Sequence, residues 1–267
     1  MLQEARDLRA EVDELHALLK KLDAEQWWAP TPFKQWTPFD VVAHLHASDR
    51  VALLSVEDEA AFVAMAQGRP VDGKKSPFAG RMPRDGMDTQ DPATLLAQWH
   101  GTLDTLCTKL DACDPNARLK WFGPDMGVRM FATARQMETW AHAQDVFDLL
   151  REPRVYTDRL KGICQIGVRT FGWTFANRKL APPGPPPYVR LTAPSGATWE
   201  WNAPEAGATP DSSVEGTASD FCHVVTQNRN VVDSQLRVTG DVAKQWMAIA
   251  QCFAGPPVDP PPPGTRV

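Results

Sequence analysis

Apolar side chains recur at helical spacing in four stretches of the first 150 residues, and this periodicity limits the possible folds more than any other feature of the chain. The first stretch places leucine or valine every three or four positions, at Leu8, Val12, Leu15, Leu19 and Leu22. A stripe of this kind is the buried face of an amphipathic helix. Comparable stretches cover residues 38–65, 91–110 and 126–150. Four amphipathic helices of this length predict an all-α four-helix bundle.

Two of these helices have clear start signals. Thr37 is a preferred N-cap residue, Pro38 suits the first helical position, and Asp40 places negative charge at the positive end of the helix. The dipeptide Asp91-Pro92 predicts a second start by the same logic. Residues 68–88, which lie between the two helices, are rich in glycine, proline and charge and predict a loop.

A proline cluster, A-P-P-G-P-P-P-Y-V, separates the helical half of the chain from a different architecture. A helix predicted over residues 156–179 cannot continue through it, because proline lacks the amide donor. Beyond the cluster, the pattern predicts strands at 188–192 and 198–201, a helix at 218–227, a strand at 236–239 and a helix at 241–253. These short elements predict a small α+β domain.

Three segments follow from this change of pattern. Residues 1–155 form the predicted helical domain, and residues 156–255 comprise a linker helix and the α+β domain. Residues 256–267 form a proline-rich tail, which we expect to be extended and mobile.

Composition narrows the possible partners and compartments. With 43% hydrophobic and 23% charged residues, the chain has the balance of a soluble globular protein, and no apolar run is long enough for a membrane span. A net charge of -5 without a basic stripe argues against nucleic acid. Five scattered cysteines without a Cys-x-x-Cys pair argue against a disulfide scaffold, and the N-terminus lacks signal-peptide character. We therefore expect a cytoplasmic protein, monomeric or homodimeric.

Two of the predicted helices carry residues suited to binding a metal ion. Glu138 and His142 are four residues apart, so they lie on one helix face, one turn from each other. A histidine from the helix that begins near residue 38 would complete a three-ligand set with open positions. His44 and His46 lie about 200 degrees apart around that helix, so at most one faces the interior easily. Taken singly, such a Glu/His pair is usually a solvated helix face, and such a histidine is usually a core residue.

Two motifs give the chain a recognisable likeness. W-T-P-F-D-V-V-A-H-L-H-A-S-D begins at Trp36, and R-Q-M-E-T-W-A-H-A-Q-D begins at Arg135. Together they resemble the DinB/YfiT-like metalloprotein superfamily, and within it the mycothiol-dependent maleylpyruvate isomerase type. V-E-G-T-A-S-D-F, T-Q-N-R-N and L-R-V-T-G-D resemble the sterol-carrier-like C-terminal half of those isomerases. V-R-T-F-G-W-T-F-A-N-R and A-Q-C-F-A-G-P-P are similar to an actinobacterial branch of uncharacterised metal-binding proteins in this group.

The resemblance implies a site, a cofactor and a fold. It maps a His/Glu/His metal triad onto His44, Glu138 and His142, with zinc as the usual ion and mycothiol as a possible cosubstrate. It also implies a DinB-like bundle followed by a sterol-carrier-like domain. A functional arginine of the family falls on Arg229, although the surrounding Q-N-R-N departs from the isomerase pattern. As a catalytic residue Arg229 would hold a carboxylate, and otherwise it forms a structural salt bridge.

Two further residues are candidates for supporting the ligands. Asp145 lies one turn past His142 and is placed to accept the second N–H of that histidine. Arg135 lies one turn before Glu138 and either orients its carboxylate or forms an exposed ion pair with it. Asp49 is expected to be structural, and Trp140, beside the motif, is a candidate for lining a pocket.

Three functions remain open. The first is a metal-dependent isomerase or thiol transferase that activates a mycothiol-like thiol for reaction with a small electrophile. The second keeps the metal without the thiol, as a hydrolase, lyase or cyclase of secondary metabolism. The third is a non-catalytic protein that binds a metal or another ligand, because a fold alone does not dictate chemistry.

Overall fold

A computed structural model describes residues 2–69, 78, 81–123 and 125–266. It divides into two compact units, Met1–Arg151 and Glu152–Val267. This division lies a few residues before the boundary at 155 that the sequence pattern suggests. None of the helices in the described ranges combines the length and the apolar character needed to cross a bilayer.

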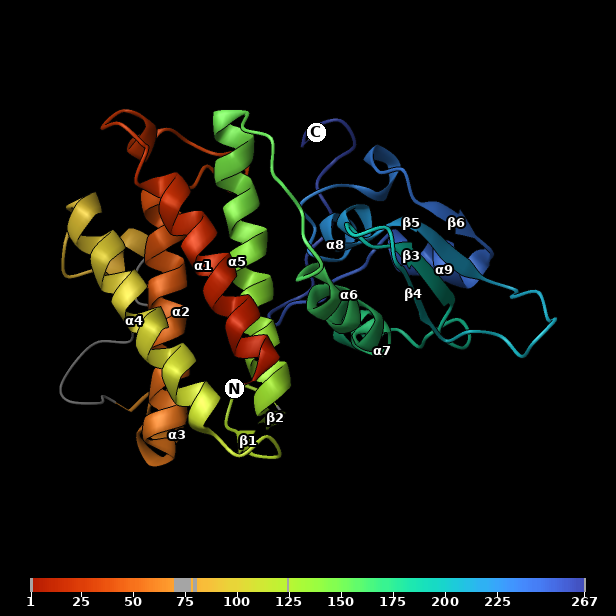
Figure 1. Cartoon of the computed structure of the whole chain (residues 1–267), viewed down its shortest axis with the longest axis horizontal. Helices are drawn as coiled ribbons and strands as arrows, with labels where there is room; N and C mark the ends of the chain where they lie inside the picture. Colours follow the sequence, from red (N-terminus) through yellow and green to blue (C-terminus); the bar gives the residue numbers. More distant parts are fainter. Residues whose placement is uncertain (1, 70–77, 79–80, 124, 267) are drawn as a thin grey trace. The chain divides into compact units, whose positions relative to one another are not determined.

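Four long helices make up most of the first unit (Figure 1). They are α1 (Gln3–Leu19), α2 (Pro38–Glu57), α4 (Pro92–Ala112) and α5 (Val128–Leu150). Helix α1 packs against α4 and α5, and α2 packs against the same two helices. The leucine stripe of α1 lies inside this packing, because Leu8, Leu15 and Leu19 are completely buried. The helical periodicity therefore identified these four helices and the buried face of α1.

The structure confirms both predicted helix starts, at Pro38 and at Pro92. The Thr37 hydroxyl accepts a hydrogen bond from the Asp40 amide, and the Asp40 carboxylate accepts one from the Thr37 amide, which forms a capping box at the start of α2. The Asp91 carboxylate accepts from the Thr94 amide at the start of α4. These contacts satisfy amide groups that have no partner within their own helix.

Some boundaries in the first unit differ from the prediction. The helix expected to run towards residue 65 ends at Glu57, and α3 (Glu59–Ala66) begins after Asp58, whose side chain caps the Ala61 amide. Helix α5 begins two residues later than expected, because β2 (Met126–Gly127) pairs with β1 (Arg118–Leu119). The cap at Asp58 and the pairing of β1 with β2 therefore set helix boundaries that the hydrophobic pattern alone does not predict.

Only part of the loop predicted over residues 68–88 can be compared. Residues 70–77 and 79–80 lie outside the described part of the chain. The described remainder contains a short 3-10 helix, η2 (Pro83–Gly86). Another short 3-10 helix, η1 (Gln26–Trp28), lies before α2. From η2, Arg84 forms a bidentate ion pair with the buried Asp40 of α2. This contact attaches the described end of the loop to the start of α2.

A buried ion pair connects three of the long helices. The Arg135 Nε of α5 donates to the Asp49 carboxylate of α2 at 2.7 Å, and both side chains are almost fully enclosed. The Trp99 indole of α4 donates to the other oxygen of Asp49 at 3.0 Å. Asp49 is thus structural, as expected, whereas Arg135 is buried rather than exposed.

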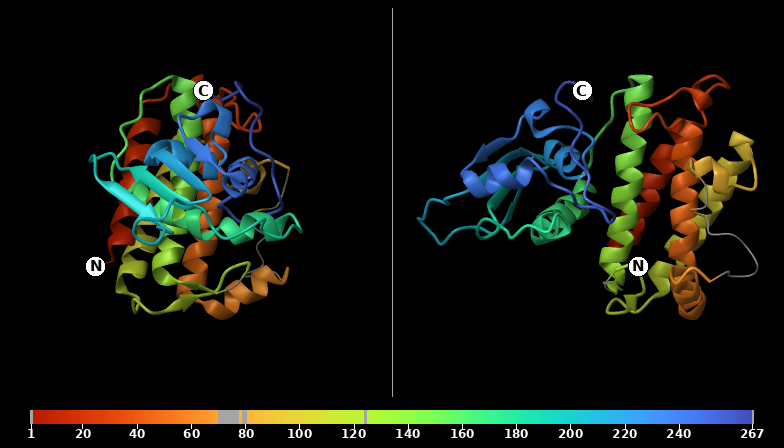
Figure 2. Two further views of the ribbon diagram at one scale, coloured as in Figure 1. Left: turned by 90° about the vertical axis from the view of Figure 1, so that its right-hand side faces the viewer. Right: turned by 180° about the vertical axis from the view of Figure 1, so that it is seen from behind.

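The second unit is a small sheet with helices packed against it (Figure 2). Its strands are β3 (Tyr188–Thr192), β4 (Thr198–Trp201), β5 (Ser213–Thr217) and β6 (Arg237–Thr239), in the order β4-β3-β5-β6. Strands β3 and β5 are parallel, and the other neighbouring pairs are antiparallel. Helix α8 (Ala218–Val225) contacts β3 and β5, and α9 (Asp241–Met247) contacts β6.

The small α+β architecture of this unit agrees with the pattern, although several elements differ in detail. The helix predicted over residues 156–179 is divided at Thr170 into α6 (Leu160–Arg169) and α7 (Phe171–Asn177). The Thr170 hydroxyl donates to the Ile166 carbonyl, which also accepts from the Thr170 backbone amide at the end of α6. Strand β5 was not predicted, because its residues S-V-E-G-T show no clear alternation of polar and apolar side chains.

The C-terminal tail forms hydrogen bonds with other residues of the second unit. Gln227 and Asn230 donate side-chain hydrogen bonds to the carbonyls of Val258 and Pro261, both at 2.8 Å. The Gly264 amide donates to the Asp233 carboxylate at 2.9 Å. Side chains of the same unit thus form hydrogen bonds with the backbone of this tail, and its expected mobility stays a prediction. None of the five cysteines, all within the described ranges, forms a disulfide.

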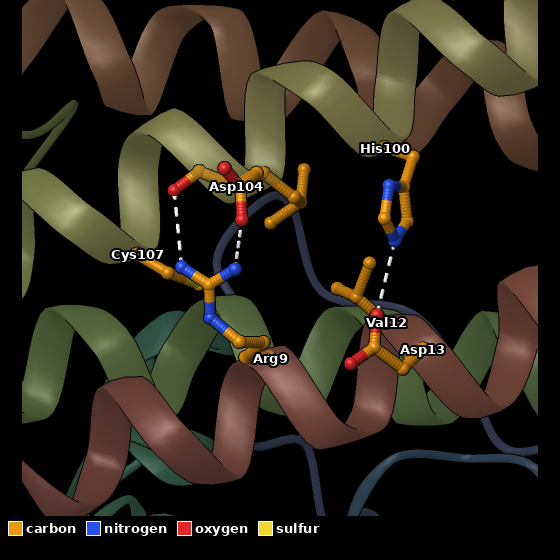
Figure 3. Close-up of a pocket in the computed structure, with 7 residues that line it drawn as sticks. Arg9, Val12, Asp13, His100, Asp104 and Cys107 are labelled. Atoms are coloured by element: carbon orange, nitrogen blue, oxygen red, sulfur yellow. Dashed lines mark hydrogen bonds and ion pairs between the residues drawn. The ribbon is translucent and has the colours of Figure 1, made fainter.

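The buried ion pair predicts a large stability effect. Asp49→Ala leaves the Arg135 charge buried without its partner, so we expect the free energy of unfolding to fall by about 3–5 kcal/mol. The control is Asp104→Ala. Asp104 pairs with Arg9 between α4 and α1, beside a small hollow (Figure 3). Both side chains are well exposed. Urea denaturation should show a loss below about 1 kcal/mol for the control. Equal losses would contradict the role given to the buried pair.

A second prediction concerns the packing of α6 on α8. A Cβ atom at Gly167 would lie 2.8 Å from a ring carbon of Phe221 and 2.9 Å from a methyl of Val225. Gly167→Ala should therefore destabilise the second unit by about 1–3 kcal/mol. Gly172→Ala, in α7, meets nothing within 4 Å and should be neutral or stabilising by up to about 1 kcal/mol. Thermal unfolding of the two variants tests this, and a destabilised Gly172 variant with an unaffected Gly167 variant would refute it.

Candidate metal centre

The three residues predicted to bind a metal lie together in the first unit. His44 comes from α2, whereas Glu138 and His142 come from adjacent turns of α5. One ligand atom from each residue lies within 4.8 Å of the ligand atoms of the other two. Glu138 Oε2 is 3.7 Å from His44 Nε2 and 3.8 Å from His142 Nε2. The carboxylate oxygen is therefore almost equally distant from the two imidazole nitrogens.

These separations fit two ligands of one ion better than they fit direct hydrogen bonds. A nitrogen and an oxygen at 3.7 or 3.8 Å are beyond hydrogen-bond distance. Two atoms that each lie about 2.1 Å from a tetrahedral ion are about 3.4 Å apart. Two imidazoles and one carboxylate are also a donor set found in zinc sites that leave a position open. Distances and donor types thus both suit a divalent metal.

The ionisation states at neutral pH also suit metal binding. Burial alone would raise the pKa of Glu138. The nearby His44, the Arg135 charge and His142 together lower it by more than burial raises it, so that the pKa is about 2. Burial is the main cause that lowers the pKa of His44 below its usual value. Glu138 is therefore an anion and His44 is neutral at pH 7. Those are the forms that donate electron pairs to a metal.

Asp145 lies in contact with the triad, whereas Arg135 acts on it through its charge. His142 Nδ1 is 3.3 Å from the Asp145 carboxylate, a long hydrogen bond that leaves Nε2 directed towards Glu138. Arg135 donates to Asp49, as described above, and its charge lowers the pKa of Glu138. Both residues lie where the sequence placed them, one turn from a candidate ligand, and their supporting roles stay predictions.

His44 and His46 differ in whether they lie beside the other candidate ligands. His44 belongs to the triad, whereas His46 does not. His46 is nevertheless the more enclosed of the two, with 6% of its surface exposed, and burial followed by the Arg50 charge lowers its pKa to about 4. Of the two histidines only His46 is buried, whereas His44, the residue of the triad, is half-buried.

Two aromatic residues beside the triad were not expected. The Trp36 ring lies 5.2 Å from the His44 ring and 5.6 Å from the His142 ring, and it stacks on the latter. The Phe33 ring lies 5.2 Å from that of His142. Trp140, the expected pocket residue, is only 2% exposed. The available signal was the position of Trp36, directly before the N-cap of the helix that carries His44.

Arg229, the candidate catalytic residue, belongs to the second unit. It follows the C-terminal end of α8, and its guanidinium donates to the Asn228 carbonyl at 3.0 Å. The side chain is partly buried. Its proposed role in holding a substrate carboxylate stays a prediction.

Comparisons with known proteins agree with these observations. Residues 8–147 match the model of the mycothiol maleylpyruvate isomerase N-terminal domain. Two uncharacterised proteins of Mycobacterium tuberculosis, from strains CDC 1551 / Oshkosh and ATCC 25618 / H37Rv, are each 42% identical to this chain over 257 residues. The alignments cover 94% of this chain and 95% of each relative.

Solved structures show a likeness in fold. Crystal structures of a mycothiol-dependent maleylpyruvate isomerase and of a mutant of it each match with a TM-score of 0.52. Their sequences are 13% and 14% identical to this chain, and the matches cover 83% of this chain and 87% of theirs. Helices in the first unit and a small sheet in the second are consistent with that fold. The chain belongs to the family defined by the mycothiol maleylpyruvate isomerase N-terminal domain.

Proposed function

We propose that this protein is a metal-dependent enzyme of the maleylpyruvate isomerase type. In this proposal His44, Glu138 and His142 bind a divalent ion, most simply zinc, and a mycothiol-like thiol reacts with a small electrophile. The observation that carries the proposal is the placement of three metal-binding atoms within 4.8 Å of one another. Membership of the family supports the thiol, because the family is named for a mycothiol-dependent reaction.

We infer that the two units correspond to the two halves suggested by the motifs. The four long helices of the first unit would be a DinB-like four-helix bundle. The α+β second unit would be the sterol-carrier-like half. The packing of α1 and α2 against α4 and α5 supports the first assignment. The mixed four-stranded sheet with α8 against it supports the second.

Each residue has a defined task in this proposal. His44 and His142 would bind the ion through their imidazoles, Glu138 would bind it through its carboxylate, and Asp145 would fix the tautomer of His142. A divalent ion in this position supplies Lewis-acid chemistry that lowers the pKa of a bound water or thiol towards about 7.

The thiol and Arg229 act on the substrate. The thiol would lose its proton to solvent, and the thiolate would form a bond to one carbon of an electrophilic double bond as the π electrons move to the adjoining carbonyl oxygen. Return of these electrons breaks the carbon–sulfur bond and releases the isomerised substrate and the thiolate. The planar guanidinium of Arg229 would hold a substrate carboxylate through two hydrogen bonds.

Metal binding by the triad is the first test. We expect the purified protein to hold one divalent ion per chain, measured by plasma mass spectrometry. His44→Ala, Glu138→Gln and His142→Ala should each weaken affinity by more than about 100-fold, because residues that only support ligands already contribute about 10- to 100-fold. His46→Gln is the matched control on α2 and should keep the metal. A wild type without metal, or triad variants that retain it, would refute the site.

Dependence on the thiol is the second test. The metal-loaded protein should isomerise maleylpyruvate only when mycothiol is present, and S-methyl mycothiol, which cannot form a thiolate, should not replace it. Absorbance of the substrate follows the reaction. Turnover without mycothiol would favour a metal-dependent hydrolase, lyase or cyclase instead. Binding of metal without turnover of any tested electrophile would favour a non-catalytic protein.

A further inference from the structure

Residues 31–36 form a tight loop directly before α2. The Thr31 amide donates to the Trp36 carbonyl at 2.7 Å, and the Trp36 amide donates to the Phe33 carbonyl at 2.9 Å. These two hydrogen bonds bring the ends of the loop together. They also place Phe33 and Trp36 on the same side of it, with ring centroids 5.1 Å apart and ring planes nearly perpendicular. We refer to these two rings as the aromatic corner.

The aromatic corner lies against both histidines of the triad. The Trp36 ring stacks on His142, with an angle of 24° between the planes, and is tilted by 48° to His44. The Phe33 ring meets His142 nearly edge-on, at 67°. A ring that covers the face of a ligand imidazole lies beside the bond from that imidazole to the ion. A ligand that approached the proposed ion from this side of the triad would therefore meet the aromatic corner.

The backbone of the loop is strained where it presents these rings. Lys34 and Gln35 have φ values of 51° and 58°, the left-handed region that residues with a side chain rarely adopt. Strain of this kind persists where surrounding contacts require it, often at ligand sites. Here the side-chain amide of Gln35 donates to the Thr31 carbonyl. The Lys34 ammonium lies 4.9 Å from the Phe33 ring centroid and 5.6 Å from that of Trp36. These contacts stabilise one conformation of the aromatic corner.

We propose that Trp36, supported by Phe33, is a specificity-determining residue that contacts the substrate beside the metal. This inference rests on the proposed metal site and adds a substrate class to it. The aromatic corner selects molecules in which a flat unsaturated or aromatic body adjoins the metal-binding atoms, because such a body stacks on the indole. A saturated body of the same size gains less from this contact.

Two hydroxamates provide the probe, because they share one metal-binding group. Benzohydroxamate carries an aromatic ring next to it, and acetohydroxamate carries a methyl group. Calorimetric titration of the metal-loaded wild type should give clearly tighter binding of benzohydroxamate. Trp36→Leu should weaken benzohydroxamate about fivefold to tenfold and acetohydroxamate less than about twofold, as expected for one lost aromatic contact. Trp36→Phe, which keeps a ring, should retain most of the preference.

Trp28→Leu is the matched control. Trp28 belongs to the same segment before α2, but its ring stacks on Phe39 at 4.8 Å and the guanidinium of Arg84 lies over it. This variant should bind both hydroxamates like the wild type. If Trp36→Leu loses its metal, Phe33→Leu is measured in its place, with a loss of benzohydroxamate affinity expected.

The possible outcomes separate this inference from the proposed function. A wild type that holds no metal refutes the metal site and the inference with it. A metal-loaded wild type that binds neither hydroxamate, or binds both equally, overturns the inference and leaves the site intact. Equal weakening of both hydroxamates by Trp36→Leu, or the same selective loss in Trp28→Leu, also overturns it.

Discussion

The ion pair between Asp49 and Arg135 is the interaction on which the candidate metal centre depends. It joins α2 to α5 in the protein interior, and Trp99 extends it to α4. Asp49 lies little more than one turn after His44, and Arg135 lies one turn before Glu138. The pair therefore fixes the register of the two helices beside the residues that must meet. Two buried charges are costly to remove from water, so their geometry has to be satisfied closely.

The same pair also influences the charge of the site. Arg135 bonds Asp49 and lowers the pKa of Glu138. Burial raises the pKa of Asp49, whereas its contacts with Arg135 and Trp99 oppose that rise. Glu138 keeps a negative charge at neutral pH, which a divalent cation bound at the triad, as proposed, would offset.

Local spacing predicted what lies within one helix, and it failed where distant segments meet. The relation between Glu138 and His142, and the cap at Thr37, follow from helical geometry over four residues or fewer. The pairing of Asp49 with Arg135 spans 86 positions, so no local pattern reveals it. The contacts of Trp36 with His142 were not predicted, because they depend on how α5 packs against α2. The break at Asp58 and strand β5 were missed because one capping side chain and one parallel pairing decided them.

The separation of the ligands along the chain has a consequence for how the protein folds. His44 is 94 positions away from Glu138, so the triad does not exist in an unfolded chain, unlike the closely spaced ligands of a zinc finger. Closing so long a loop costs entropy, which the apolar core and the Asp49–Arg135 pair must offset before any ion arrives. If the triad binds an ion as proposed, uptake of that ion would follow the formation of the tertiary structure and would not nucleate it.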